Sequence, residues 1–182
     1  MVTLITGAAH SGKSRYAESI SELKNCLYIN TADLSDPHEA EKLESAKLRR
    51  PAGCTSLSAY RDFDELLFSD LFRSHKCLIL DDAASMLRRT YKEVLSDADK
   101  PDEAQLSRCE ERVKDELLRL IAICKNEGKD LAIVTEENVR DIAFSAELSR
   151  AYAESLGRIN CVAAKAADQA FLLCCGLPLK LK

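Results

Sequence analysis

The stretch VTLITGAAHSGKS, residues 2–14, decides the fold class of this chain. Its first five residues are apolar or β-branched and stop at a glycine, which is typical of a short, fully buried parallel strand. Residues 7–14 then match the pattern G-x-x-x-x-G-K-[ST], and a helix is predicted from Lys13 to about Lys24. Because the pattern lies between a strand and a helix, it predicts a phosphate-binding loop rather than an ordinary glycine turn.

The predicted loop assigns roles to its polar groups around a nucleoside triphosphate. Its backbone N–H groups and the N-terminus of the following helix would face the β-phosphate. Lys13 is predicted to reach the β- and γ-phosphates, and the Ser14 hydroxyl to ligate Mg²⁺. His10 occupies a position that the motif leaves free, so we favour a space-filling role for it over a phosphate contact. The predicted nucleotide-binding residues are Gly7, Ala8, Ala9, His10, Ser11, Gly12, Lys13 and Ser14.

Apolar runs like the first one recur along the chain, separated mostly by segments of helix length. They cover residues 26–30, 76–81, 130–135 and 170–175. This alternation predicts an α/β fold: a single P-loop NTPase (RecA-like) domain over residues 1–182, with a mainly parallel sheet flanked by helices. Helical segments are predicted over residues 37–50, 62–73, 83–95, 106–124 and 144–167, a loop over 96–105, and a final strand over 179–181.

Carboxylates follow two of the predicted strands. Asp81 ends the run 76–81 and is predicted to hold Mg²⁺ with Ser14, directly or through water. Asp82 could support that metal site or cap the next helix, and both aspartates could simply begin the helix. Glu137 follows the run 130–135 and is predicted to face the site, with a solvated glutamate pair as the alternative. The predicted catalytic residues are Lys13, Asp81 and Glu137.

The composition argues against several classes of protein. The 26 Lys and Arg residues are spread among 30 Asp and Glu, for a net charge of -4, so no basic face is predicted that would bind nucleic acid. No apolar run approaches the roughly 20 residues that a membrane span needs, and we predict a cytoplasmic protein. The eight cysteines include no C-x-x-C pair, which favours buried free thiols over a metal or disulfide framework. His38 and His75 are predicted to lie at the surface.

Further motifs occur in order along nearly the whole chain. They are LITGAAHSGKSRYAE at 4–18, CLYINTA at 26–32, Arg50-Pro51, Asp81, Leu148-x-Arg150, GRIN at 157–160, AAD at 166–168 and G-x-P-x-K at 176–180. Together they resemble the adenosylcobinamide kinase/adenosylcobinamide-phosphate guanylyltransferase family of cobalamin biosynthesis. The resemblance implies ATP or GTP as phosphate donor, a corrinoid precursor similar to adenosylcobinamide as acceptor, and a homotrimer.

Two features depart from that family. Its members pass GMP through a guanylylated histidine five residues before the proline of the Arg-Pro pair, where this chain has Ala46. An alanine methyl has no lone pair to attack an α-phosphate, and neighbouring Ser45 lacks a base. The glycine-rich stretch that follows the family glutamate is also absent after Glu137. The resemblance therefore implies a kinase without guanylyl transfer at this position, and leaves open a nucleotide-binding subunit without catalysis or a kinase for another small molecule.

Overall fold

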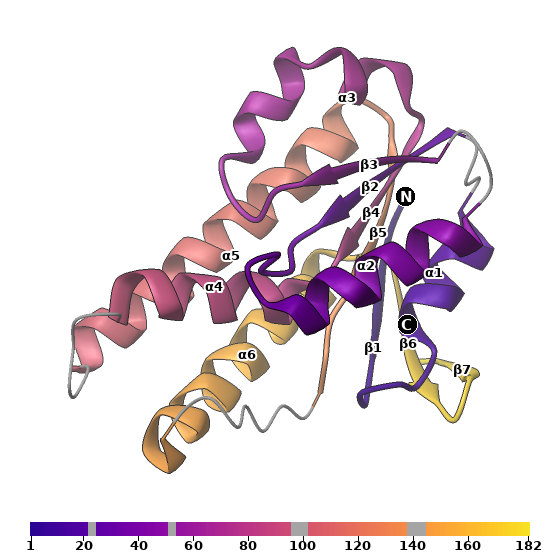
Figure 1. The fold of residues 1–182 in the computed structure, drawn as a ribbon. Coiled ribbons are helices and arrows are strands. Elements are labelled where there is room, and N and C mark those ends of the chain that lie inside the picture. Colours follow the sequence, from indigo (N-terminus) through magenta and orange to yellow (C-terminus); the bar gives the residue numbers. More distant parts are fainter. Residues whose placement is uncertain (22–24, 51–53, 96–101, 138–144) are drawn as a thin grey trace.

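The computed structural model describes residues 1–21, 25–50, 54–95, 102–137 and 145–182. Within these ranges, seven strands form one sheet in the order β3-β2-β4-β5-β1-β6-β7 (Figure 1). All neighbouring strands are parallel except β6 and β7, which pair antiparallel. The predicted α/β fold with a mainly parallel sheet is therefore confirmed. The strands are β1 (Val2–Gly7), β2 (Cys26–Asn30), β3 (Thr55–Ser58), β4 (Cys77–Asp81), β5 (Asp130–Val134), β6 (Gln169–Cys174) and β7 (Leu177–Lys180).

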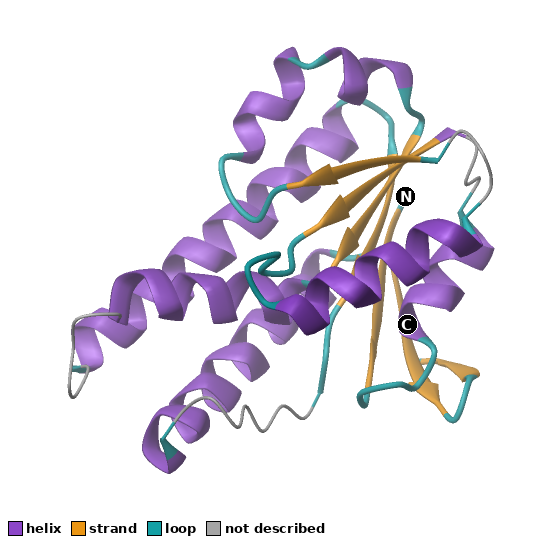
Figure 2. Cartoon of the chain, in the orientation of Figure 1, coloured by secondary structure: helices purple, strands orange, loops and turns teal. Residues whose placement is uncertain are grey.

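Helices cover both faces of this sheet (Figure 2). One face carries α1 (Lys13–Ile20) and α2 (Pro37–Arg49), which lie in front of the strands in Figure 1. The other face carries α4 (Ala83–Leu95), α5 (Glu103–Asn126) and α6 (Ala146–Ala166). The short helices η2 (Phe63–Phe68) and α3 (Asp70–Ser74) complete this second layer, and η2 packs against α5.

The strands contribute alternate side chains to two separate cores. Successive residues of a strand point to opposite faces, so a sheet covered on both sides needs nearly continuous apolar strands. On the α4–α6 face the core includes Leu4, Leu27, Leu78, Leu80 and Leu131, all at most 3% exposed. On the α1 face it includes Ile5, Tyr28, Ile79, Val134 and Ala17. This double burial explains why the central strands read as unbroken apolar runs in the sequence.

Several element boundaries differ from the prediction. The segment 62–73 is not one helix, because Ser69 caps a new one: its Oγ accepts a hydrogen bond from the Phe72 N–H at 3.1 Å. Helix α5 begins inside the predicted loop 96–105, because Asp102 and Gln105 form a capping box. Residues 96–101 of that loop lie outside the described residues. Strand β3 has no counterpart among the predicted strands, since its four residues are largely polar and only half-buried on alternate positions.

The cysteines are all free, but only some are buried. The prediction that the cysteines are buried is confirmed for Cys26, Cys77, Cys109 and Cys124. The same prediction is wrong for Cys161, Cys174 and Cys175, which are exposed. The last two lie where the β6–β7 pair turns at the edge of the sheet, a position that no helix covers in Figure 1. None of the described helices is long and apolar enough to cross a bilayer.

Candidate active site

The loop between β1 and α1 turns sharply at two glycines. Gly7 has a φ of 145° and Gly12 a φ of 96°, values that glycine tolerates and larger residues rarely adopt. A Cβ on Gly7 would also lie 2.4 Å from the carbonyl oxygen of Leu173 and 2.9 Å from Ser11 Oγ. Helix α1 begins at Lys13, so the positive end of its dipole is directed at the concave side of the loop. The predicted order of strand, loop and helix is confirmed.

Lys13 lies in this loop with its charge held inside the protein. The side chain is only 7% exposed, and Nζ donates a hydrogen bond to the Ala8 carbonyl oxygen at 2.8 Å. Nζ also lies 3.7 Å from Glu136 Oε1, at the end of β5. Burial, followed by the nearby Asp82 carboxylate, raises the pKa of Glu136, and the Lys13 charge counteracts both effects. The ammonium group is thus positioned over the loop, between the Ala8 carbonyl oxygen and the Glu136 carboxylate.

Asp81 meets Ser14 across the sheet edge. The Ser14 hydroxyl forms a hydrogen bond with the Asp81 carboxylate, and Tyr28 Oη donates a hydrogen bond to Asp81 Oδ2. Burial is the main cause that raises the pKa of Asp81 to about 6, and the adjacent Asp82 charge adds to it. The two residues predicted to hold a metal ion are therefore in contact, with a carboxyl group that loses its proton reluctantly.

Asp82 performs the helix-capping role that was its alternative. Its Oδ1 accepts a hydrogen bond from the Ser85 N–H at 2.6 Å, at the start of α4. Its backbone N–H donates to Thr31 Oγ1 at 2.8 Å, which ties the end of β4 to the segment after β2. Asp82 also lines the cavity described below.

Of the two glutamates after β5, Glu136 is the one that lines the cavity. Glu137 is exposed, and its Oε1 accepts a hydrogen bond from Thr6 Oγ1 at 3.3 Å, beside the start of the loop. The catalytic role assigned to Glu137 stays a prediction. The sequence offers no local signal to separate the two, because which one faces the cavity depends on how the chain leaves the strand.

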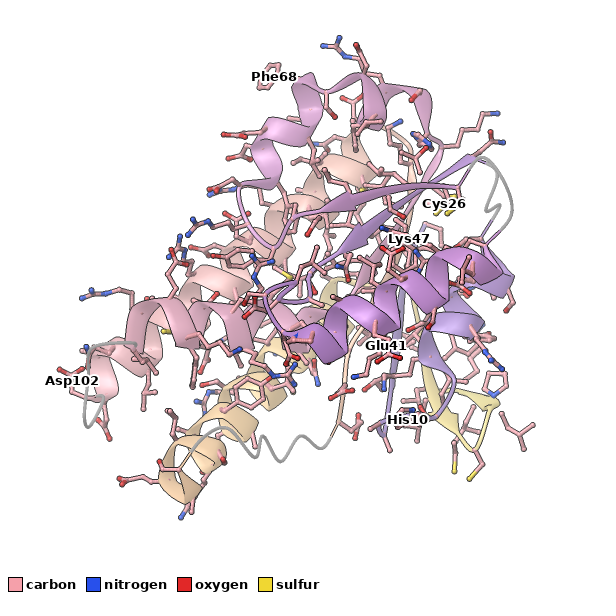
Figure 3. The ribbon with its side chains drawn as sticks, in the orientation of Figure 1. His10, Cys26, Glu41, Lys47, Phe68 and Asp102 are labelled. Atoms are coloured by element: carbon pink, nitrogen blue, oxygen red, sulfur yellow. The ribbon has the colours of Figure 1, made fainter. Side chains whose placement is uncertain are left out.

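A cavity of about 760 Å³ lies over the carboxyl ends of the strands, a volume typical of ligand sites. The phosphate-binding loop forms one side of it, and α2 forms another. Figure 3 shows α2, which carries Glu41, above the loop that carries His10. Both of these residues line the cavity, as does Ala46 of α2. The lining residues from the sheet edge are Tyr28, Asn30, Asp81, Asp82, Val134 and Glu136.

Arg50, just after α2, links that helix to Tyr28, the partner of Asp81. Its guanidinium carbon lies 3.3 Å from the centroid of the Tyr28 ring, and Nε pairs with Glu18 Oε1 at 2.9 Å. Arg50, Tyr28 and Glu18 all lie in the motifs that carry the family resemblance, but the sequence assigned a role in the site to none of them. No local pattern predicts this arrangement, because it joins α1, β2 and the end of α2.

The histidines have different positions. His10 lines the cavity and adopts a left-handed backbone conformation with a φ of 58°. His75 is buried rather than at the surface, because its ring nitrogens contact the Leu71 carbonyl oxygen at 2.6 Å and Thr55 Oγ1 at 3.0 Å. The side chain of His38 lies outside what the structure describes.

The fold is similar to that of a solved structure. A KaiC-like protein from the hyperthermophilic archaeon Pyrococcus horikoshii superposes with a TM-score of 0.51 over 94% of this chain and 71% of that one, at 14% identity. This likeness confirms the RecA-like P-loop fold and carries nothing further about activity.

Comparisons of sequence are more specific. The bifunctional adenosylcobalamin biosynthesis proteins CobU of Escherichia coli K12 and Salmonella typhimurium LT2 are 30% and 31% identical to this chain, and in each case the alignment covers 100% of both proteins. The family model described as cobinamide kinase/cobinamide phosphate guanyltransferase matches residues 3–181. Nearly the whole chain matches, including the loop, the strand-end aspartate and α2. The chain therefore belongs to the CobU family of cobinamide kinases and cobinamide phosphate guanyltransferases.

Proposed function

We propose that this protein is a kinase that transfers the γ-phosphoryl group of ATP or GTP to a hydroxyl of a cobinamide-like corrinoid precursor. The observation that carries the proposal is the meeting of Lys13 with the Ser14–Asp81 pair in one cavity. In such a transfer the acceptor oxygen bonds to the γ-phosphorus, the bond to the bridging β–γ oxygen breaks, a nucleoside diphosphate leaves, and the hydroxyl proton is released. The work of the protein is positioning and charge neutralisation.

Ser14 and Asp81 fit a Mg²⁺ ion. Magnesium takes hard oxygen ligands, and in phosphoryl-transfer sites it uses one or two carboxylates together with water and substrate phosphates. A hydroxyl and a carboxylate already in contact supply such oxygens, and the pKa of Asp81 is raised by its burial and by the neighbouring Asp82 carboxylate. When bound, the ion would neutralise phosphate charge. No group of three or more His, Cys, Asp or Glu suited to a metal is found among the described residues, so substrate and water would complete the shell.

Lys13 would exchange its bond to the Ala8 carbonyl for the β- and γ-phosphates. Its Nζ is already aimed over the loop, and a lysine moves its donors with little rearrangement of the backbone. We assign the cavity-facing carboxylate role to Glu136, since its oxygen lies 3.7 Å from Nζ. We retain Glu137 as a supporting residue at the base of the loop.

Guanylyl transfer is left out of the proposal. Ala46 lines the cavity from α2, so a side chain at this position faces the ligand. The resemblance puts the guanylylated histidine of the family at this position, and an alanine cannot form the covalent bond. The homotrimer implied by the resemblance stays a prediction.

Transfer of label tests the proposed function. We expect γ-labelled ATP or GTP, incubated with the protein, Mg²⁺ and adenosylcobinamide, to place label in the corrinoid. The Asp81→Asn variant serves as the control, because it should place less label in the corrinoid. Tight nucleotide binding with no label in the corrinoid would instead support a nucleotide-binding subunit without catalysis. Label in another small molecule, and none in the corrinoid, would support a kinase with a different acceptor.

Asp81→Asn is expected to raise stability and lower function together. A carboxyl group whose pKa is raised to about 6 from 3.8 costs stability in its charged form. The cost develops as pH rises from about 4 to about 6 and is complete above that. Asp81 as a whole residue is partly accessible at the end of β4, so we discount the effect of the pKa shift. At pH 7.5 without metal, we expect the variant to be more stable by about 1–2 kcal/mol, a Tm increase of roughly 2–8 °C. The increase should vanish below about pH 4. Thermal unfolding of the variant and the unmodified protein over a range of pH values measures this difference in Tm.

The companion variant Asp82→Asn separates the metal role from the capping role. Calorimetry of nucleotide binding with Mg²⁺ should show a larger loss for Asp81→Asn than for Asp82→Asn, since Asp81 contacts Ser14 while Asp82 caps α4. Equal losses, or a larger one at Asp82, would reverse the assignment of the metal ligand.

A further inference from the structure

Two buried polar atoms in the cavity lining have no hydrogen-bond partner among the described residues. They are Ser11 Oγ and Asn30 Nδ2, and the two side chains belong to residues only 8% and 7% exposed. A buried donor without a partner costs free energy comparable to a lost hydrogen bond, so native proteins seldom keep one without a reason. Ser11 belongs to the phosphate-binding loop and is accounted for by the nucleotide. Asn30 is not.

Asn30 lies on the far side of Asp81 from the loop. It ends β2, and its register partner on β4 is Asp81. The strand order β1, β5, β4, β2 therefore sets the loop, Glu136, Asp81 and Asn30 in sequence along the carboxyl edge of the sheet. At about 4.8 Å per strand, Asn30 is one spacing from Asp81 and roughly 14 Å from the end of β1.

The phosphoryl acceptor has to enter on this side. A triphosphate gripped by the loop directs its γ-phosphate away from the loop, toward Lys13 and the Ser14–Asp81 pair. The attacking oxygen approaches in line, opposite the leaving β-phosphate. The cavity is also lined by Ala32 and by Leu43 and Ala46 of α2, and its volume of about 760 Å³ is within the range of ligand sites.

Two cationic side chains that line the cavity near α2 already have partners. Arg50 stacks on Tyr28 and pairs with Glu18, and Lys42 of α2 pairs with Glu39 at 2.8 Å. The Asn30 amide, in contrast, is a buried donor of the lining that has no partner among the described residues. An amide carries no charge, so it can contact a hydroxyl oxygen before transfer and a phosphate ester oxygen afterwards. It does so without competing with Lys13 for the triphosphate.

We infer that Asn30 binds the acceptor: its Nδ2–H donates a hydrogen bond to the oxygen of the corrinoid precursor that receives the phosphoryl group. The inference rests on the proposed function and assigns the acceptor side of the same site. Asn30 thereby becomes a residue that selects a hydroxyl-bearing ligand beside Asp81, while Ser11 serves the nucleotide.

Two alanine variants test this division. Asn30→Ala should raise the KM for adenosylcobinamide about 2- to 12-fold, the range for one neutral hydrogen bond, and leave the Kd for Mg²⁺ and a non-hydrolysable ATP analogue within twofold. Ser11→Ala should do the reverse, raising the nucleotide Kd and sparing the acceptor KM. Asn30→Asp keeps the shape, loses the donor and adds a negative charge beside Asp81, so its acceptor KM should rise further than that of Asn30→Ala.

Direct titration of adenosylcobinamide into the protein with the ATP analogue distinguishes a failure of this inference from a failure of the proposed function. If the unmodified protein binds and phosphorylates the corrinoid but Asn30→Ala and Asn30→Asp match it, the inference is overturned and the proposed function stands. Parallel loss of nucleotide and acceptor affinity, or a fall in Tm in both variants, would make Asn30 a structural residue and also overturn the inference. If the unmodified protein neither binds nor phosphorylates the corrinoid, the proposed function and the inference fail together.

Discussion

Lys13→Ala is expected to weaken binding of ATP or GTP by about 100-fold or more while leaving the fold intact. The lysine contributes charge-assisted hydrogen bonds to the β- and γ-phosphates, each about 1.5–3 kcal/mol, and 1.4 kcal/mol corresponds to a factor of ten in Kd. In the protein itself Nζ interacts with the Ala8 carbonyl and with Glu136, both at the edge of the cavity, so its removal disturbs little of the core. Calorimetric titration with Mg²⁺ present measures the loss, and circular dichroism checks the fold.

Lys47→Ala is the matched control for this experiment. It removes the same charge from an exposed position of α2, where Lys47 pairs with Glu44 at 2.7 Å, and Lys47 is not among the residues that line the cavity. Its nucleotide affinity should equal that of the unmodified protein. A folded Lys13→Ala variant with unchanged affinity would remove the phosphate-binding role from Lys13. A similar loss in Lys47→Ala would show a general effect of net charge instead.

The protein is also expected to form no stable guanylyl-enzyme intermediate. Such an intermediate needs an imidazole nitrogen that attacks the α-phosphorus of GTP in line, with pyrophosphate leaving. The resemblance puts the family nucleophile at Ala46, which lines the cavity and carries only a methyl group. His75 is buried against Leu71 and Thr55, outside the cavity. His10 lines the cavity but belongs to the loop that binds the β-phosphate, where attack on the α-phosphate is poorly aligned.

Incubation with GTP labelled at the α-phosphate, followed by separation under denaturing alkaline conditions, checks for the phosphoramidate. We expect no protein-bound label. Acid-labile label retained on the protein would contradict the prediction, and its loss in one of the His10, His38 or His75 to alanine variants would identify the nucleophile.

A histidine placed at position 46 tests whether the other groups needed for guanylyl transfer are still in place. Ala46→His places an imidazole in the cavity, and the matched control Leu48→His places one on the same helix at a position 89% exposed. Label on Ala46→His alone would show that the remaining groups for guanylyl transfer survive. Label on both variants would indicate unspecific reaction of any exposed imidazole.

Part of the site followed from the sequence because it is local. The glycines of the loop, Lys13 and Ser14 occupy fixed steps along a strand, a turn and a helix, so their spacing alone predicts how they face a phosphate. Asp81 followed by the same logic, as the polar residue that ends an apolar strand. Asn30 ends β2 in the same manner and could have been found by the rule that singled out Asp81.

What the sequence by itself determined is the fold class, the phosphate-binding loop and the strand that ends at Asp81, since each depends on backbone geometry and periodicity within about twenty residues. Only the tertiary structure decided which side chains meet. Tyr28 contacts Asp81, and Asn30 lies beside it, because β2 and β4 are neighbours. Glu136 reaches Lys13 because β5 lies beside β1. Strand order is set by the packing of both faces of the sheet over long sequence separations, and no short motif encodes packing of that kind.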